Sequence, residues 1–211
     1  MSLTKQTGDE FRAELAWRSS FETEGRWGIP LVRRQQLVDG KIDLIAYADT
    51  KPHDIEANTR RGVHFFIDDP RFEGIYKNPD NTLAKVAQYR FLLTPDHSVY
   101  ADMKPWMQLQ SVAKSRWVGA CWQSHGLTVY PTMSWGTAQT FEFCFRGFER
   151  GGTVAIATYA CKSAKSLYLP GYYEMLRQLE PEHIICLGEP FPEMSEVDIV
   201  VDHVKARKAV R

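Results

Sequence analysis

Acidic residues follow several apolar segments of the chain, at the points where those segments end. They are Asp49 after segment 42–48, Asp68 and Asp69 after 63–67, Asp96 after 89–94, and Glu189 after 183–187. If these segments are parallel strands, their carboxyl ends meet at one edge of the sheet and the acids share a small volume. Mutual repulsion would then separate their pKa values, as acid–base catalysis by two carboxyl groups requires. We expect Asp96 to be the nucleophile or base and Asp68 the complementary acid.

The same acids fit two other interpretations. Carboxylate oxygens bind divalent cations, so Asp49, Asp68, Asp69 and Glu189 could serve a metal-dependent hydrolase or nuclease. Asp after a strand also commonly caps the following turn or helix, which would make each acid structural. The sequence predicts no cofactor, with a divalent cation as the alternative.

Aromatic rings alternate with polar side chains in the stretches that follow the third and fourth apolar segments. The candidate ligand-binding residues are Ser98, Tyr100, Arg116, Trp117, Trp122, Gln123, Ser134 and Trp135, joined by Thr158 at the end of the fifth segment. Flat rings beside amide and guanidinium groups could stack a nucleobase and bind its edge. The alternative for Trp117 and Trp122 is that they only pack a helix against the sheet.

Alternating strand and helix patterns must position these side chains. We expect strands at 42–49, 63–69, 89–94, 127–130, 154–158, 183–187 and 197–201, and helices after residue 79 and at 105–124, 140–148 and 170–180. Gly126 should end the 105–124 helix, and Pro170 should begin the last helix. Continuous apolar strands separated by helices predict an α/β fold with a parallel sheet covered on both faces.

Two architectures suit this pattern. A small or incomplete TIM-like (β/α) barrel is favoured over an open doubly wound sheet, because almost every strand ends in polar residues. Residues 1–35 are polar with scattered aromatics and are expected to form an arm packed on a single domain of residues 36–211. A chain of 211 residues suits one such domain.

Composition narrows the class of protein. Lys and Arg together number 26, as do Asp and Glu, so the formal net charge is zero and gives no general attraction to nucleic acid or membrane. The beginning of the chain has no apolar signal segment, and no run of eighteen apolar residues predicts a membrane span. The four cysteines have no metal-ligand spacing and are expected to be reduced. These features predict a cytoplasmic protein.

Several enzyme signatures are absent from the sequence. No G-x-x-x-x-G-K-[ST], G-x-G-x-x-G, H-E-x-x-H or G-x-S-x-G motif occurs. This argues against P-loop NTPases, typical dinucleotide enzymes, zincins and α/β-hydrolases.

Longer motifs carry a resemblance to a known family. The chain resembles the domain of unknown function 4417 family in segments 63–73, 94–100, 116–119, 122–123, 131–135, 143–147 and 154–158, within residues 27–190. The resemblance implies a protein of bacteria, phages or mobile elements, and it implies no activity.

Taken together, the residues favour an enzyme that acts on a nucleobase, nucleoside or nucleic acid. A hydrolase or transferase at an N-glycosidic bond would use paired carboxyl groups and stacking rings in this way, an analogy at fold level. The alternatives are the metal-dependent hydrolase and a non-enzymatic protein that sequesters a nucleotide or blocks a host protein. We expect a nucleotide-like small molecule or nucleic acid as partner and no membrane, and the oligomeric state is open.

Overall fold

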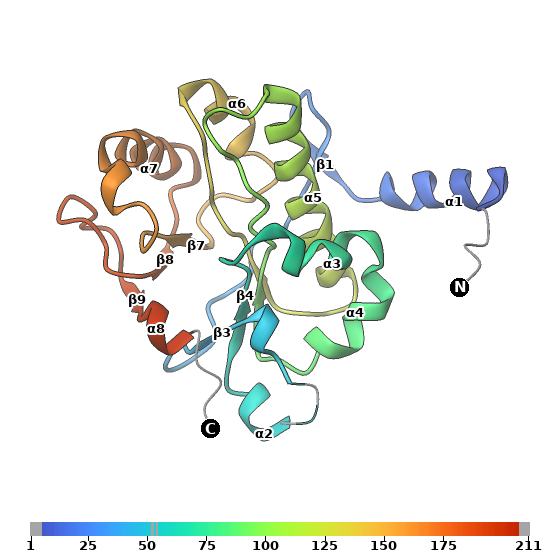
Figure 1. Cartoon of the computed structure of the whole chain (residues 1–211), viewed down its shortest axis with the longest axis horizontal. Helices are drawn as coiled ribbons and strands as arrows, with labels where there is room; N and C mark the ends of the chain where they lie inside the picture. The colour runs from blue at the N-terminus through green and yellow to red at the C-terminus, as the bar shows by residue number, and fades with distance from the viewer. Residues whose placement is uncertain (1–5, 52, 54, 207–211) are drawn as a thin grey trace.

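Parallel strands alternate with helices in the computed structural model, which describes residues 6–51, 53 and 55–206 (Figure 1). Among these residues, the parallel strands form two sheets with the orders β3-β4-β5-β6 and β7-β8-β9. The predicted α/β class is therefore confirmed. The strands are β3 (Leu44–Ala46), β4 (Gly62–His64), β5 (Phe91–Leu93), β6 (Val129–Tyr130), β7 (Thr153–Ala157), β8 (His183–Leu187) and β9 (Ile199–Val201).

Each strand pairs in parallel with the strand that precedes or follows it in the chain. The register aligns Leu92 with Val129 between β5 and β6, and Ile185 with Ile199 between β8 and β9. An isolated parallel bridge between Thr132 and Ala155 connects the residues after β6 to β7, so the two sheets meet there. This arrangement brings the carboxyl ends of neighbouring strands together. Closure into a barrel stays a prediction.

The helices that cover the sheets match most of the expected positions. The predicted 105–124 helix is confirmed as α5 (Pro105–Ser124), and Gly126 follows it with a positive φ of 78°. The remaining helices and turns are α2 (Ile55–Asn58), α3 (Glu73–Lys77), α4 (Pro79–Val86), α6 (Phe141–Cys144), α7 (Lys165–Leu179) and α8 (His203–Ala206), with 3-10 turns at Tyr47–Asp49, Asp69–Arg71, Ala138–Thr140 and Lys162–Ala164.

The prediction that Pro170 begins the last long helix was wrong. Helix α7 begins at Lys165, so Pro170 lies inside it. Proline lacks the N–H that would bond one turn back, which costs helix stability. Tyr168 and Leu169 pack against the buried cluster beneath α7, and this burial stabilises the turn before the proline.

The first described residues form an arm that touches the body at few places. Helix α1 (Gly8–Arg18) begins with a reciprocal cap, in which Thr7 Oγ1 accepts from the Glu10 amide and Glu10 accepts from the Thr7 amide. None of its residues is buried, and the helix extends away from the sheets (Figure 1). Its end is anchored by Trp117, whose Nε1 donates to the Arg18 carbonyl at 2.9 Å. The short antiparallel pair β1 (Thr23–Glu24) and β2 (Ile29–Pro30) follows.

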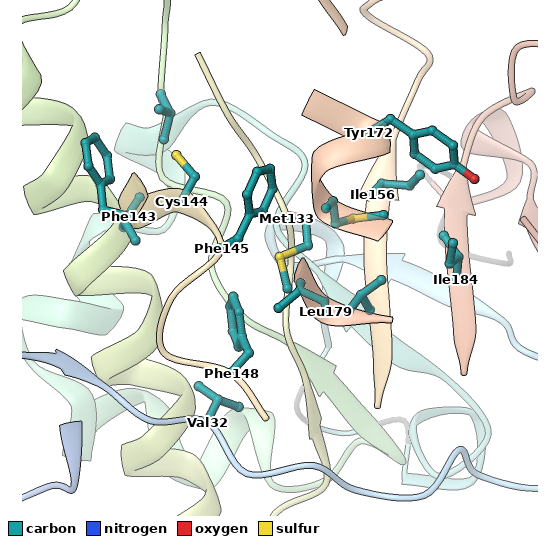
Figure 2. Packing of buried hydrophobic residues seen from close by; sticks show 14 of the residues in the cluster. Val32, Met133, Phe143, Cys144, Phe145, Phe148, Ile156, Tyr172, Leu179 and Ile184 are labelled. Carbon is teal, nitrogen blue, oxygen red and sulfur yellow. The ribbon is translucent and has the colours of Figure 1, made fainter. Parts of the chain in front are cut away.

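Alternating residues of the strands divide the core between two faces. On one face, Val154 and Ile156 of β7 pack with α6 and α7, including Phe145 and Leu179 (Figure 2). A second cluster on that side lies between the β3–β6 sheet and helices α3, α4 and α5. The opposite faces of both sheets contribute to a third cluster, which contains Leu44, Phe66, Phe91, Leu93, Tyr130, Ala155, Ile185, Leu187 and Val201.

No helix within the described ranges is long and apolar enough to cross a membrane. Cys121, Cys144, Cys161 and Cys186 are all free thiols.

The close approach of β4 and β5 predicts that Gly62 tolerates no side chain. A Cβ atom at Gly62 would lie 2.1 Å from Cε2 of Phe91, which is 1% exposed and is confined by its neighbours. We expect Gly62→Ala to lower the free energy of unfolding by about 1–3 kcal/mol, the usual cost of overpacking. Chemical denaturation measures this loss.

Gly74→Ala is the matched control, because a Cβ at Gly74 in α3 meets no atom within 4 Å. This control should be as stable as the parent or slightly more stable, since alanine favours helix. Equal stability of Gly62→Ala and the parent would contradict the packing described for β4 and β5.

Candidate functional site

A cavity of about 350 Å³ lies at the carboxyl ends of β4, β5, β6 and β7, beside the beginning of α7. Its wall combines two acids, two serines and several rings. The lining residues are Phe66, Ile67, Asp68, Asp96, Ser98, Val99, Tyr100, Met133, Ser134, Trp135, Ala157, Tyr159, Ala160, Cys161 and Tyr168.

Two buried threonines align the segments that carry the polar floor of this cavity. Thr132 donates from its amide to Thr94 Oγ1 at 2.8 Å and from its hydroxyl to the Thr94 carbonyl at 2.7 Å. Asp96 and Ser134 each lie two residues further along these paired segments. The Ser134 hydroxyl donates to the Asp96 carboxyl group. The pairing of β5 with β6 thus continues into the site.

Asp96 is held in an environment that disfavours its charge. Its Oδ1 atom is buried and has no hydrogen-bond partner in the described part of the chain. Burial raises the pKa of Asp96 from 3.8 to about 7, against the opposing effect of the Ser134 hydrogen bond. Nearby Asp69 raises the pKa further, and Arg116 lowers it. A carboxyl group with this pKa exchanges a proton near neutral pH, as a general acid or base must.

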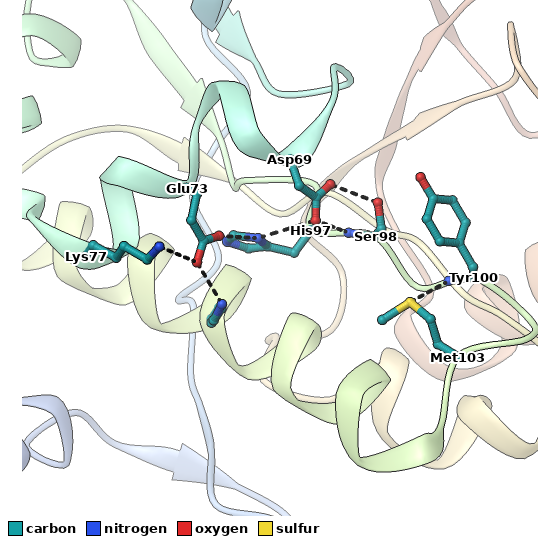
Figure 3. A network of polar contacts seen from close by, with 8 residues as sticks. Asp69, Glu73, Lys77, His97, Ser98, Tyr100 and Met103 are labelled. Atoms are coloured by element: carbon teal, nitrogen blue, oxygen red, sulfur yellow. Dashed lines mark hydrogen bonds and ion pairs between the residues drawn. The ribbon is translucent and has the colours of Figure 1, made fainter.

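Asp69 lies behind the wall and orients Ser98 (Figure 3). Its carboxylate accepts from the Ser98 amide at 3.1 Å and from the Ser98 hydroxyl at 2.8 Å. His97 is buried next to this pair, with Nδ1 3.9 Å from Asp69 and 3.7 Å from Glu73. Burial lowers the pKa of His97 to about 4 despite both acids, so the ring is neutral at pH 7.

Aromatic side chains form much of the remaining wall. Trp135 lies against Tyr168 with 4.7 Å between ring centroids, and its Nε1 donates to the Tyr168 carbonyl. Gly171 of α7 makes this possible, because a Cβ there would lie 2.2 Å from Trp135 Nε1. The Tyr159 hydroxyl donates to the Phe66 carbonyl at 3.0 Å. Tyr100 is 64% exposed at the rim.

Six residues predicted as site residues line the cavity: Asp68, Asp96, Ser98, Tyr100, Ser134 and Trp135. The other predicted acids do not. Asp49 lies half-buried at the end of the turn after β3, and Glu189 is exposed and pairs with Lys162 at 3.3 Å. Thr158 is buried and donates to the Glu189 carbonyl.

Arg116 lies inside the fold, where it joins segments rather than lining the cavity. Its guanidinium donates to the carbonyl groups of Thr132, Cys144 and Arg146, and it lies 3.8 Å from the centroid of the Phe148 ring. Burial lowers the pKa of Arg116 to about 9. These contacts stabilise the floor of the site from behind.

The two tryptophans of α5 and the neighbouring glutamine also lie outside the cavity wall. Trp117 and Trp122 are buried in the cluster between α5 and the sheet. Gln123 accepts from the Arg33 amide and donates to the Arg33 carbonyl, which fixes the chain before β3 against α5. All three therefore contribute to packing in this structure.

Sequence reasoning missed three of the rings that line the cavity, which are those of Phe66, Tyr159 and Tyr168. Tyr159 comes two residues after β7, so the strand-end argument extended past Thr158 would have found it. Tyr168 lies in the part of α7 that the sequence placed before the helix. Its hydroxyl is buried without a partner among the described residues, and burial raises its pKa well above the usual 10.

The described residues contain no group of three or more His, Cys, Asp or Glu side chains arranged to hold a metal ion. In particular, of the four acids proposed as metal ligands only Asp68 lines the cavity.

Comparisons with known proteins relate the chain to phage proteins. Residues 21–204 match the family described as Domain of unknown function (DUF4417). The chain is 37% identical to the Gene 1 protein of Mycobacterium phage L5 over 175 residues, covering 82% of this chain and 76% of that protein. It is 35% identical to the Gene 1 protein of Mycobacterium phage D29 over 174 residues, covering 81% of this chain and 64% of that protein. No solved structure matches the chain.

The raised pKa of Asp96 predicts a pH dependence of stability. Between about pH 4 and pH 7 the folded protein keeps the Asp96 proton that the unfolded chain has lost. The contribution of this group is therefore fully present below pH 4 and is lost as pH rises toward 7. We expect the melting temperature of Asp96→Asn to fall less between pH 5 and pH 8 than that of the parent.

Asp102→Asn is the control for this titration, because Asp102 is exposed and follows the same strand. Its melting curve should keep the parent's pH dependence. An Asp96→Asn variant with the parent's full decline would show that Asp96 ionises as an ordinary surface acid.

Proposed function

The chain belongs to the DUF4417 family, and we propose that it is a phage or mobile-element enzyme that acts on a nucleobase, nucleoside or nucleic acid. The observation that carries this proposal is the half-buried Asp96 carboxyl group, which lines a cavity with aromatic walls and whose Oδ1 atom is buried without a partner among the described residues. A cavity of about 350 Å³ suits a flat ligand of nucleoside size. Trp135 and Tyr168 provide rings against which such a ligand can pack.

The proposed reaction is hydrolysis or transfer at an N-glycosidic bond. Asp96, protonated near neutral pH, donates its proton to the base nitrogen as the bond between that nitrogen and the sugar carbon breaks. Water or an acceptor hydroxyl then adds to the sugar carbon and gives its proton to Asp68 at the rim. This reverses the roles expected from the sequence, because burial favours the protonated form of Asp96.

A non-enzymatic binding protein is the second candidate. It is favoured by the exposure of Asp68, which is less confined than a paired catalytic carboxylate usually is. Such a protein would use the same cavity to sequester a nucleotide-like ligand without turnover.

An incomplete barrel is part of the proposal. Its support is the third buried cluster, to which strands of both sheets contribute and which also contains Ala206 of α8. The consecutive strand order and the bridge between Thr132 and Ala155 agree with this arrangement. Action in the cytoplasm is also proposed, and the four free thiols support it.

Asp96→Asn separates these candidates. We expect the parent to release free base from nucleosides or single-stranded nucleic acid, and the variant to be slower by about 100-fold or more, because an amide cannot donate an acidic proton. Chromatographic measurement of released base tests this, with Asp102→Asn as the control that keeps the parent's rate.

Binding of a nucleoside by the parent without any release of base would favour the sequestering protein. Equal rates for the parent and Asp96→Asn would refute the role of Asp96 as acid.

A further inference from the structure

A second cavity, of about 600 Å³, lies at the amino ends of β3 and β4, where β9, α2 and α8 approach them (Figure 1). Its floor is apolar and includes the buried side chains of Ile42, Leu44 and Val201. It shares no lining residue with the cavity at the carboxyl ends of the strands. A ligand in this second cavity would therefore contact none of the residues assigned to the proposed reaction.

The wall of the second cavity contains more cationic side chains than anionic ones. Four cations come from three separate parts of the chain, and they are Lys41, Arg60, Arg61 and Lys205. The two acids of the wall are Asp43 and Asp202. This excess of positive charge beside an apolar floor attracts anions, because walls of low polarity concentrate the field of the charges.

Both acids of the wall already have partners within the protein. Asp43 pairs with Lys41 at 2.9 Å. Asp202 precedes α8 and accepts from the amides of Val204 and Lys205 at 2.8 and 3.4 Å. The charge of each carboxylate is thus offset locally, and the uncompensated charge of the wall is positive.

The other cations of the wall are available to an anionic ligand. Arg61 and Lys205 form no ion pair within the described part of the chain. Arg60 pairs with Glu56, but this carboxylate lies outside the wall, and the two side chains are 72% and 82% exposed. Exposed ion pairs contribute little to stability, so a bound anion can replace Glu56 as the partner of Arg60.

The backbone that carries the two arginines is held by hydrogen bonds. The Asn58 side chain is buried and donates to the Lys51 carbonyl at 2.8 Å. The Arg61 carbonyl accepts from the Arg90 amide at 3.0 Å. Arg60 and Arg61 therefore leave adjacent positions of a fixed turn, and guanidinium groups bind phosphate through pairs of parallel hydrogen bonds.

The distribution of the cations indicates the class of ligand. They lie before β3, before β4 and in α8, around a cavity large enough for a ligand of nucleotide size. A single carboxylate would reach only part of this wall, whereas linked phosphate groups carry several charges over a greater length. We propose that the second cavity binds the linked phosphate groups of a nucleoside polyphosphate or of a nucleic-acid backbone.

Isothermal titration calorimetry of the intact chain at low salt tests this site with three probes. Inorganic tripolyphosphate supplies the charge alone, adenosine 5′-triphosphate represents the nucleoside polyphosphates, and a single-stranded deoxythymidine decanucleotide represents the backbone. We expect tripolyphosphate and at least one organic probe to bind, and any lesser result overturns the proposal. The organic probe that binds more tightly identifies the source of the phosphate groups.

The double variant Arg61→Gln/Lys205→Gln removes the two cations that have no ion pair. It should weaken the binding of each probe by about tenfold or more, as expected for the loss of two charge-assisted contacts. Lys205→Gln alone changes an exposed side chain and should weaken binding by about threefold. Undiminished binding by both variants would overturn the proposal.

Arg71→Gln/Lys104→Gln is the matched control, because it removes the same two charges from exposed positions outside the wall. This control should bind all probes as the parent does, and both double variants should melt at the parent's temperature. An equal loss of affinity in the two double variants would show a general attraction to surface charge, which also overturns the proposal.

Discussion

The hydrogen bonds between Thr94 and Thr132 set the geometry on which the site depends. They extend the pairing of β5 with β6 beyond the last residues of both strands, where side chains begin to face the cavity. Ser115 of α5 donates to the Thr94 hydroxyl, and Arg116 donates to the Thr132 carbonyl, so the same helix supports both segments. Because Thr94 and Thr132 are buried and fully hydrogen-bonded, they leave little conformational freedom to Asp96 and Ser134, which lie two residues further along the two segments.

The rigid segments that hold Asp96 also make its position energetically unfavourable. Its surroundings hold the Oδ1 atom of the carboxyl group away from water without giving it a partner among the described residues, although burial of such an atom is unfavourable. The compensation comes from the apolar clusters on either side of the sheets. Asp96, His97 and Tyr168 all have buried polar atoms without a partner among the described residues. Buried polar groups of this kind are candidates for a functional site.

The sequence predicted the elements better than the orientations of their side chains. Strand ends are marked locally by the change from apolar to polar residues, so Asp68, Asp96 and Ser134 could be placed in one cavity without a structure. Helix α5 is buried over nearly its whole circumference between Ser115 and Trp122, and periodicity cannot show which face meets a cavity. The burial of Arg116 among carbonyl groups, and the contribution of Tyr168 from before Pro170, depend on tertiary contacts that leave no local pattern.

The consecutive order of the strands has a consequence for folding during synthesis. Each parallel strand pairs with a neighbour in the chain, so loop-closure entropy remains small and the sheets can grow as residues leave the ribosome. The segment around Val32 behaves differently, because it bridges to Phe148 and its neighbour Arg34 bonds to Glu149. The segment around Val32 can form these contacts only after residues 148 and 149 have been synthesised. Its docking is therefore a late event of nascent-chain folding.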